Sequence, residues 1–168
     1  TMKLLKKADQ VVTLIESMST NIGIENTVVG HGVDVNTFVC NPQKRLSNIQ
    51  QEHVILCAGR VRKAKGQAIL VEAAKVLKAH KNWALVIVGQ VDKPPFLEVL
   101  KGIANKNSIA DQVYFIDETT DIISYYQASK IAVVPSFSEG FSLVTAEAMS
   151  CECSVIATQD VGVHSLLI

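Results

Sequence analysis

Two carboxylates, Glu139 and Glu147, lie eight residues apart in the sequence, with Gly140 and Phe141 between them. The apolar run before them, Ile131 to Pro135, is typical of a buried parallel strand. A turn from such a strand into a helix exposes backbone amides at the positive end of the helix, where a diphosphate binds well. We therefore expect Glu139 to accept hydrogen bonds from sugar hydroxyls and Glu147 to accept them from a ribose. The alternative is that both are surface carboxylates near a helix start.

A second group of residues that could bind a ligand follows another short apolar run. It consists of Gly59, Arg60 and Lys65. A loop at the carboxyl end of a parallel strand is where open α/β sheets bind ligands. Arg60 can clamp phosphate oxygens with its forked guanidinium, and Lys65 can contribute a point charge. Arg62 and Lys63 in the same loop are expected to be solvated.

These residues require an alternation of strands and helices to position them. The expected strands are Val11–Ile15, Thr27–Val29, Val54–Ala58, Ala84–Val88, Val113–Ile116, Ile131–Val134 and Ser154–Ala157. The expected helices are Ser17–Ile22, Gln67–Ala79, Phe96–Lys106, Ile122–Ala128 and Leu143–Met149, with Ser142 as the N-cap of the last. Strands that alternate with helices indicate right-handed βαβ units. The predicted fold class is therefore α/β, a Rossmann-like parallel sheet with helices on both faces.

The composition limits the classes of function. The chain has 168 residues, of which 48% are apolar, and its formal net charge is zero. Such a chain can bury a core but is short for two full domains. Nucleic-acid-binding domains usually carry an excess of positive charge, which this chain lacks, so DNA or RNA binding is not expected. No apolar run approaches the roughly 18 residues of a spanning helix, and no signal peptide is recognised. We expect a cytoplasmic protein, with the inner face of the membrane as the alternative location.

The four cysteines do not form a recognisable metal motif. Cys40 and Cys57 are isolated, and Cys151-Glu-Cys153 lacks the spacing and the partner histidines of a zinc site. As alternate residues at the entrance of a strand, Cys151 and Cys153 are expected to point to opposite faces. We expect reduced, structural thiols and no bound metal. His31 is expected to make a hydrogen bond in a linker rather than to take part in catalysis.

Five segments, in this order and spacing, resemble the C-terminal half of the family 4 glycosyltransferases, which are retaining enzymes with two Rossmann-like domains (the GT-B type). They are similar to that family's last N-domain strand, its N-G-V-D…F linker, its phosphate-binding loop, the end of its next strand and its paired-glutamate motif. The matching segments are Ala8–Val12, His31–Asp34 with Phe38, Gly59–Gly66, Val86–Gly89 and Glu139–Met149.

The resemblance implies transfer of a sugar from a nucleotide diphosphate sugar to an acceptor hydroxyl, with retention at the anomeric carbon. It implies neither a metal nor a cofactor, so protein groups must stabilise the charge that develops on the leaving diphosphate. The expected catalytic residues are Arg60, Lys65 and Glu139. The expected donor-binding residues are Gly59, Arg60, Lys65, Ile116, Glu139, Gly140, Phe141, Ser142, Leu143 and Glu147. The base is expected near Ile116 to Glu118, where the family commonly has glycine and this chain has Asp117.

The resemblance also predicts the domain organisation: residues 1–29 as a remnant of an N-terminal domain, 30–52 as the linker, and 53–168 as a C-terminally incomplete nucleotide-sugar-binding domain. The rest of the N-terminal domain would bind the acceptor, a glycan or lipid-linked glycan, so we expect no transfer by this chain alone. Apolar residues without partners favour a homo-oligomer, with a mobile segment as the alternative. They are Leu4, Leu5, Val11, Val12, Leu14 and Ile15.

Three glycines of the family pattern are replaced here by Ser142, Glu152 and Val163. We expect crowding of a phosphate site or strained positive-φ backbone at these positions. Other loop residues, such as those of Gly59–Gly66, look most like those of bacterial lipopolysaccharide-core mannosyltransferases, which implies GDP-mannose as the donor.

Alternative functions remain open at this point. A nicotinamide-binding Rossmann domain is disfavoured because Gly30-His-Gly32 is not followed by the third glycine of the fingerprint, position 35 being Val. A sugar-nucleotide epimerase of the same architecture is disfavoured by the spacing of Glu139 and Glu147. The main alternative is a non-catalytic remnant or binding module with the same fold.

Overall fold

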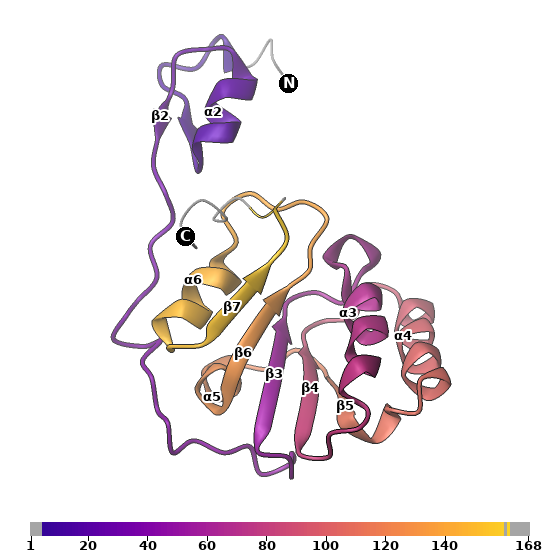
Figure 1. Cartoon of the computed structure of the whole chain (residues 1–168). Coiled ribbons are helices and arrows are strands. Elements are labelled where there is room, and N and C mark those ends of the chain that lie inside the picture. Colours follow the sequence, from indigo (N-terminus) through magenta and orange to yellow (C-terminus); the bar gives the residue numbers. More distant parts are fainter. Residues whose placement is uncertain (1–4, 160, 162–168) are drawn as a thin grey trace.

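The computed structural model describes residues 5–159 and residue 161, and contains two parallel sheets (Figure 1). The predictions that involve Leu4, Gly162 and Val163 lie outside the described residues. The smaller sheet pairs β1 (Val12–Thr13) with β2 (Thr27–Val28), and α2 (Glu16–Ile22) connects them. The predicted first strand is longer than β1, because only two residues of β2 are available to pair with it.

The larger sheet has five parallel strands in the order β5-β4-β3-β6-β7. Its strands are β3 (His53–Ala58), β4 (Trp83–Val88), β5 (Val113–Ile116), β6 (Ser129–Val134) and β7 (Ser154–Ala157). The helices that connect them are α3 (Gln67–Ala73), α4 (Pro94–Lys106), α5 (Ile122–Ala128) and α6 (Leu143–Ser150). The prediction of an α/β fold with a Rossmann-like parallel sheet is thereby confirmed.

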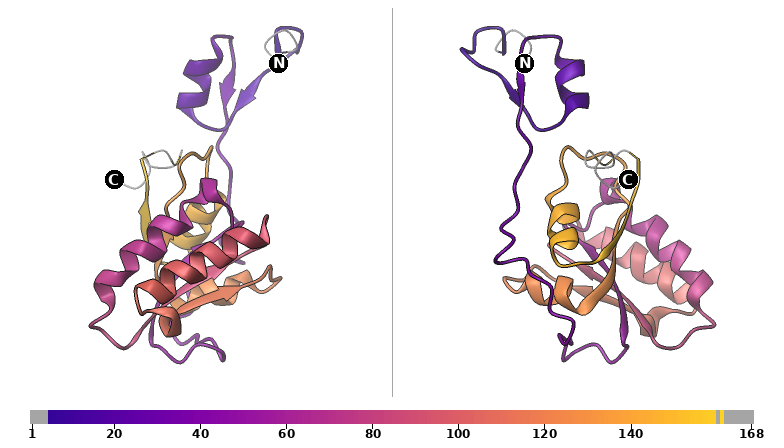
Figure 2. Two further views of the ribbon diagram at one scale, coloured as in Figure 1. Left: turned by 90° about the vertical axis from the view of Figure 1, so that its right-hand side faces the viewer. Right: turned by 60° about the vertical axis from the view of Figure 1, so that its left-hand side comes forward.

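Two hydrophobic clusters cover the two faces of the larger sheet, because successive residues of a strand point to opposite faces. Leu56 and Val86 pack with residues of α5 and α6 on one face, whereas Leu85 and Ile87 pack with residues of α3 and α4 on the other. Figure 2 shows α3 and α4 side by side on their face of the sheet. All six residues of β4 are buried, as expected for the central region of a sheet covered on both faces.

The helix predicted over Gln67–Ala79 is shorter in the structure. The α-helix ends at Ala73 and continues as a 3₁₀ turn over Ala74–Leu77. The indole Nε1 of Trp83 donates to the carbonyls of Leu77 and His80, at 2.8 and 3.0 Å. Helices commonly end in such a 3₁₀ turn, with the last carbonyls accepting hydrogen bonds from a side chain.

The two cysteines predicted to face opposite sides of the sheet instead belong to the same buried cluster. Cys151 and Cys153 both pack on the face that α5 and α6 cover. The prediction was wrong because residues two apart in a strand share one face, since only successive side chains alternate. Both cysteines also precede β7, in a turn where Glu152 takes a left-handed conformation with φ 62°.

Residues 29–52 connect the two sheets without any helix or strand. The segment runs past α6, and the Ser150 hydroxyl donates to the Phe38 carbonyl at 2.5 Å (Figure 1). The side-chain amide of Gln127 donates to the Val39 carbonyl at 2.9 Å. The linker is therefore attached to the larger unit by both α5 and α6. Among the described residues, no helix combines the length and apolar character needed to cross a bilayer.

Candidate functional site

The site lies at the carboxyl ends of the five parallel strands. The chain leaves β3 to form β4 and β5 on one side, and then returns to place β6 on the other side of β3. The strand order therefore reverses beside β3, and ligands of open α/β sheets bind in the crevice outside such a reversal point.

A pocket of about 320 Å³ opens at this edge. It is lined by residues that follow β3, β4 and β5 and by residues of α5 and α6. They are Ala58, Gly59, Arg60, Val88, Gly89, Gln90, Glu118, Thr119, Ile122, Tyr126, Val144 and Glu147. The pocket thus combines one cation, two carboxylates and several apolar side chains, a combination suited to a ligand with anionic, hydroxylated and flat apolar parts.

The ends of β3 and β4 approach each other closely at the pocket. Gly89 has φ 145°, and a Cβ at this position would lie 2.3 Å from the carbonyl oxygen of Gly59. Only glycine can be accommodated there without moving the backbone. The Gly89 amide also donates to the carbonyl of Ile116, at 3.0 Å, which attaches the end of β4 to the end of β5.

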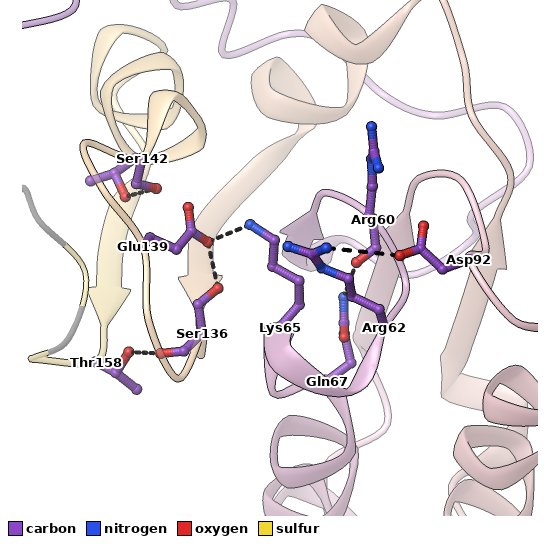
Figure 3. Close-up of polar contacts among 10 residues, drawn as sticks. Arg60, Arg62, Lys65, Gln67, Asp92, Ser136, Glu139, Ser142 and Thr158 are labelled. Atoms are coloured by element: carbon purple, nitrogen blue, oxygen red, sulfur yellow. Dashed lines mark hydrogen bonds and ion pairs between the residues drawn. The ribbon is translucent and has the colours of Figure 1, made fainter. Parts of the chain in front are cut away.

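Arg60 brings a free guanidinium to the pocket. Its side chain is exposed, and it makes neither an ion pair nor a side-chain hydrogen bond to any residue that the structure describes. Its backbone is held in place, since the side-chain amide of buried Gln67 donates to the Arg60 carbonyl at 2.9 Å (Figure 3). The charge of Arg60 is therefore available to an anion at the pocket.

Lys65 does not line the pocket but forms an ion pair beside it. Its Nζ lies 2.7 Å from Oε1 of Glu139, and the two side chains are 22% and 12% exposed (Figure 3). The Ser136 hydroxyl donates to the same carboxylate oxygen at 2.5 Å. This pair joins the loop after β3 to the loop after β6.

Backbone contacts hold the same two loops together. The Phe137 amide donates to the Ala64 carbonyl at 3.0 Å. Gly66 has φ 69°, and a Cβ there would lie 1.9 Å from the carbonyl oxygen of Pro135. The loop that carries Lys65 can therefore pack on the end of β6 only because residue 66 is glycine.

Glu147 lies on α6 and lines the same pocket as Arg60. Its Oε2 accepts a hydrogen bond from the Tyr126 hydroxyl at 2.7 Å. Burial, followed by the charge of Glu147, raises the pKa of Tyr126, so this tyrosine stays protonated and acts as the donor.

The start of α6 differs from the prediction. Ser142 occupies the N-cap position, but its hydroxyl lies 3.0 Å from the Thr145 hydroxyl and does not bind a helix amide. The reason is its left-handed backbone, with φ 65°, which replaces the extended conformation of an ordinary N-cap. Glu152 is also left-handed, so the predicted positive-φ strain is confirmed at two of the three positions where the family pattern has glycine.

The predicted site residues therefore separate into three neighbouring groups. Gly59, Arg60 and Glu147 line the pocket, whereas Lys65 and Glu139 pair beside it. The remaining turn residues are Gly140, Phe141, Ser142 and Leu143, of which Phe141 packs edge-on against His31 of the linker with ring centroids 5.6 Å apart. Of the segment predicted to lie near the base, Glu118 lines the pocket, together with its neighbour Thr119, whereas Ile116 does not.

Sequence reasoning missed Tyr126 and Gln90. Tyr126 lies in an apolar helical pattern that indicates only a core residue, and nothing in its spacing reveals the partner carboxylate. Gln90 directly follows the strand end at Gly89, a signal that could have identified it. Among residues 5–159 and 161, no group of three or more His, Cys, Asp or Glu side chains is placed to hold a metal ion.

Comparisons with known proteins agree with this architecture. The family model described as glycosyl transferases group 1 matches residues 41–168. The lipopolysaccharide core biosynthesis mannosyltransferase LpcC of Rhizobium leguminosarum bv. viciae is 30% identical over 172 residues, which cover 98% of this chain and 49% of that protein. LpsB of Rhizobium meliloti, with the same description, is 31% identical over 173 residues, with the same coverage. The chain thus spans about half the length of these relatives.

Solved structures show the same fold. The crystal structure of the C-terminal domain of LpcC, a glycosyl transferase group 1 family protein of Francisella tularensis, has a TM-score of 0.75 at 31% identity, covering 82% of this chain and 75% of that one. Anabaena HepE, solved in complex with UDP and glucose, has a TM-score of 0.88 at 21% identity, covering 99% of this chain and 49% of that one. At that identity, the second likeness concerns the fold alone.

Proposed function

The chain belongs to the glycosyl transferases group 1, and on that premise we propose that its pocket binds the nucleoside diphosphate part of a nucleotide sugar. The observation that carries the proposal is that Gly59, Arg60 and Glu147 line one pocket at the point where the strand order reverses. Arg60 supplies a fork of donors for phosphate oxygens, and Glu147 supplies acceptors for a ribose diol. A nucleoside diphosphate carries both of these groups a few bonds apart.

The proposed reaction is transfer of the donor sugar to an acceptor hydroxyl, with retention at the anomeric carbon. Negative charge then develops on the leaving diphosphate, and Arg60 and Lys65 stabilise it electrostatically. Lys65 gives one of its three N–H donors to Glu139 and keeps the other two for phosphate oxygens. Glu139 keeps Oε2 for a hydroxyl of the donor sugar. The turn of Gly140, Phe141, Ser142 and Leu143 presents the first amides of α6 to the same anion.

We propose mannose as the sugar and GDP as the nucleotide, because two relatives are mannosyltransferases of lipopolysaccharide core biosynthesis. The acceptor would then be a glycan or lipid-linked glycan in a bacterium, bound with the help of the part of these relatives that this chain does not span. Because nucleotide sugars are charged and do not cross a bilayer, we place the protein in the cytoplasm, at or near the inner face of the membrane.

A second candidate is a binding module of the same fold without useful turnover. Ser142 favours it, because a side chain stands in a left-handed position at the turn that would face the donor. The two candidates share the pocket and differ in catalysis, so binding alone does not separate them. An assay of sugar release from the donor does.

Titration calorimetry of the purified chain with GDP, UDP, ADP and GDP-mannose tests the proposed binding. We expect the guanosine nucleotides to bind most tightly. Arg60→Ala should weaken the binding of every diphosphate by about tenfold or more, the loss of a charge-assisted contact of about 1.5–3 kcal/mol. Arg62→Ala is the matched control from the same loop, where Arg62 lies 4.0 Å from Asp92. Absence of binding for all four ligands would overturn the proposed function.

A further inference from the structure

We propose that Tyr126 is the positioning residue that presents Glu147 to the ribose diol of the donor. The inference rests on the proposed function and goes one step beyond it, since it assigns a role in nucleotide affinity to a residue inside the core. Tyr126 is 0% exposed, and its hydroxyl lies 2.7 Å from Oε2 of Glu147.

The chemistry of the two groups fixes the direction of this hydrogen bond. A tyrosine hydroxyl has one proton to donate, and an ionised carboxylate only accepts. Donation to Glu147 is also the bond that satisfies the buried hydroxyl, since an unpartnered buried donor is costly. With Oε2 engaged, the carboxylate is anchored through one oxygen and keeps Oε1 for the ligand. Both residues line the same pocket, so the anchored carboxylate faces the proposed nucleotide.

Contacts to its ring and to its backbone hold Tyr126 in place. Phe38 of the linker packs edge-on against it, with ring centroids 5.9 Å apart and an interplanar angle of 70°. The Cys153 thiol donates to the Tyr126 carbonyl at 3.3 Å. The Phe38 carbonyl in turn accepts the hydrogen bond from Ser150, a residue of α6, the helix that carries Glu147. These contacts join the linker, α5 and α6 around Tyr126.

Rigid support of this kind contributes to affinity. A free glutamate has several rotamers, and a ligand that must select one loses binding energy in ordering it. Tyr126 removes part of that cost before the ligand arrives. Its effect should therefore depend on the ribose hydroxyls proposed to contact Glu147 and not on the phosphates, which are assigned to Arg60. This dependence separates a positioning role from a structural one.

The test removes the Tyr126 hydroxyl from the protein and the ribose diol from the ligand, separately and together, and compares the four affinities. The nucleotide that binds most tightly among GDP, UDP and ADP is titrated into the wild-type chain and into Tyr126→Phe. Its 2′,3′-dideoxy analogue is titrated into both proteins separately. We expect Tyr126→Phe to lower the affinity for the natural nucleotide by about fivefold, the factor that corresponds to one net hydrogen bond. The dideoxy analogue should bind both proteins with nearly the same affinity, because it lacks the groups that the anchored carboxylate would contact.

Tyr114→Phe is the matched control. Its hydroxyl donates to Gln51 at 3.0 Å, and Gln51 precedes β3, at the opposite edge of the sheet. This variant should bind both nucleotides as the wild type does, and circular dichroism should show all three proteins folded. If Tyr126→Phe lost the same factor of affinity for the natural and the dideoxy nucleotide, Tyr126 would have only a structural role, and the inference would be overturned. Unchanged affinity would overturn it as well, while leaving the proposed function intact. If no nucleotide binds the wild type, the proposed function fails, and this inference with it.

Discussion

Lys65 and Glu139, 74 residues apart in the sequence, form a close ion pair in the structure, with Nζ and Oε1 separated by 2.7 Å. The pair connects the loop after β3 to the loop after β6, the two strands at the point where the sheet order reverses. The charged groups proposed for the donor therefore hold the two sides of the site together before any ligand is present.

The first prediction concerns this pair. Lys65→Met and Glu139→Gln should each lower the free energy of unfolding, and the double variant should lose less than the sum of the two losses. We expect a coupling of about 1–2 kcal/mol, because the pair is largely shielded from solvent and is also hydrogen-bonded. Urea denaturation of the four proteins measures it. Strictly additive losses would mean that the pair contributes nothing to the closure of the two loops.

The second prediction concerns the strained backbone at Glu152. Its side chain is exposed and its φ is 62°, a region that glycine occupies without strain. Glu152→Gly should raise the free energy of unfolding by about 1 kcal/mol. Glu98→Gly, at an exposed position within α4, is the control and should lower it by a similar amount, about 1 kcal/mol. A loss of stability in Glu152→Gly would contradict the assigned strain.

The third prediction concerns pH. Burial raises the pKa of the Cys57 and Cys153 thiols from 9.0 to about 12. The unfolded chain releases these protons first as the pH rises, so it binds fewer protons than the folded chain. The stability that the two thiols contribute is therefore fully present below pH 9.0 and is lost as the pH approaches 12. The free energy of unfolding, measured by urea denaturation, should fall between pH 9 and pH 11, and it should fall less in a Cys57→Ala/Cys153→Ala variant. An identical decline in the variant would rule out the thiols as its source.

The fourth prediction concerns association. The two-stranded sheet has open edges, and Val12 and Val29 near it are 58% and 52% exposed. A sheet of two strands is marginally stable alone, so these edges and apolar groups favour contact with another chain. Light scattering should show a dimer or a larger assembly, and Val12→Lys with Val29→Lys should shift it toward the monomer. Val76→Lys, at a position 75% exposed on the larger unit, should leave the assembly unchanged. A monomeric wild-type chain would contradict the prediction.

Much of the fold could be predicted from the sequence because its signals are local. The strands β5 and β7 and the helix α5 begin and end at the predicted residues, since short apolar runs and helical patterns are bounded there by polar residues. The paired-glutamate and glycine-lysine segments likewise fall at strand ends, as expected from their position after apolar runs.

The parts that could not be predicted depend on contacts between distant segments. Tyr126 resembles any core aromatic until its hydroxyl is seen beside Glu147. The pairing of Lys65 with Glu139 requires β3 and β6 to be neighbours, and no local pattern specifies which strands of a parallel sheet lie side by side. Ser142 has a residue type typical of an N-cap, but its backbone conformation is set by the turn before it.

The position of β6 beside β3 also determines when the site comes into existence. As the chain is synthesised, β3, β4 and β5 emerge first and can pair in sequence, because each lies next to its predecessor. β6 must pass over them to reach the free edge of β3, and closing such a long loop is a slow step in folding. Until that closure, Arg60 and Glu147 belong to separate segments and no pocket joins them. If the proposed nucleotide binds, its binding during refolding would report the arrival of β6, and a saturating concentration of it would favour the closed form by mass action.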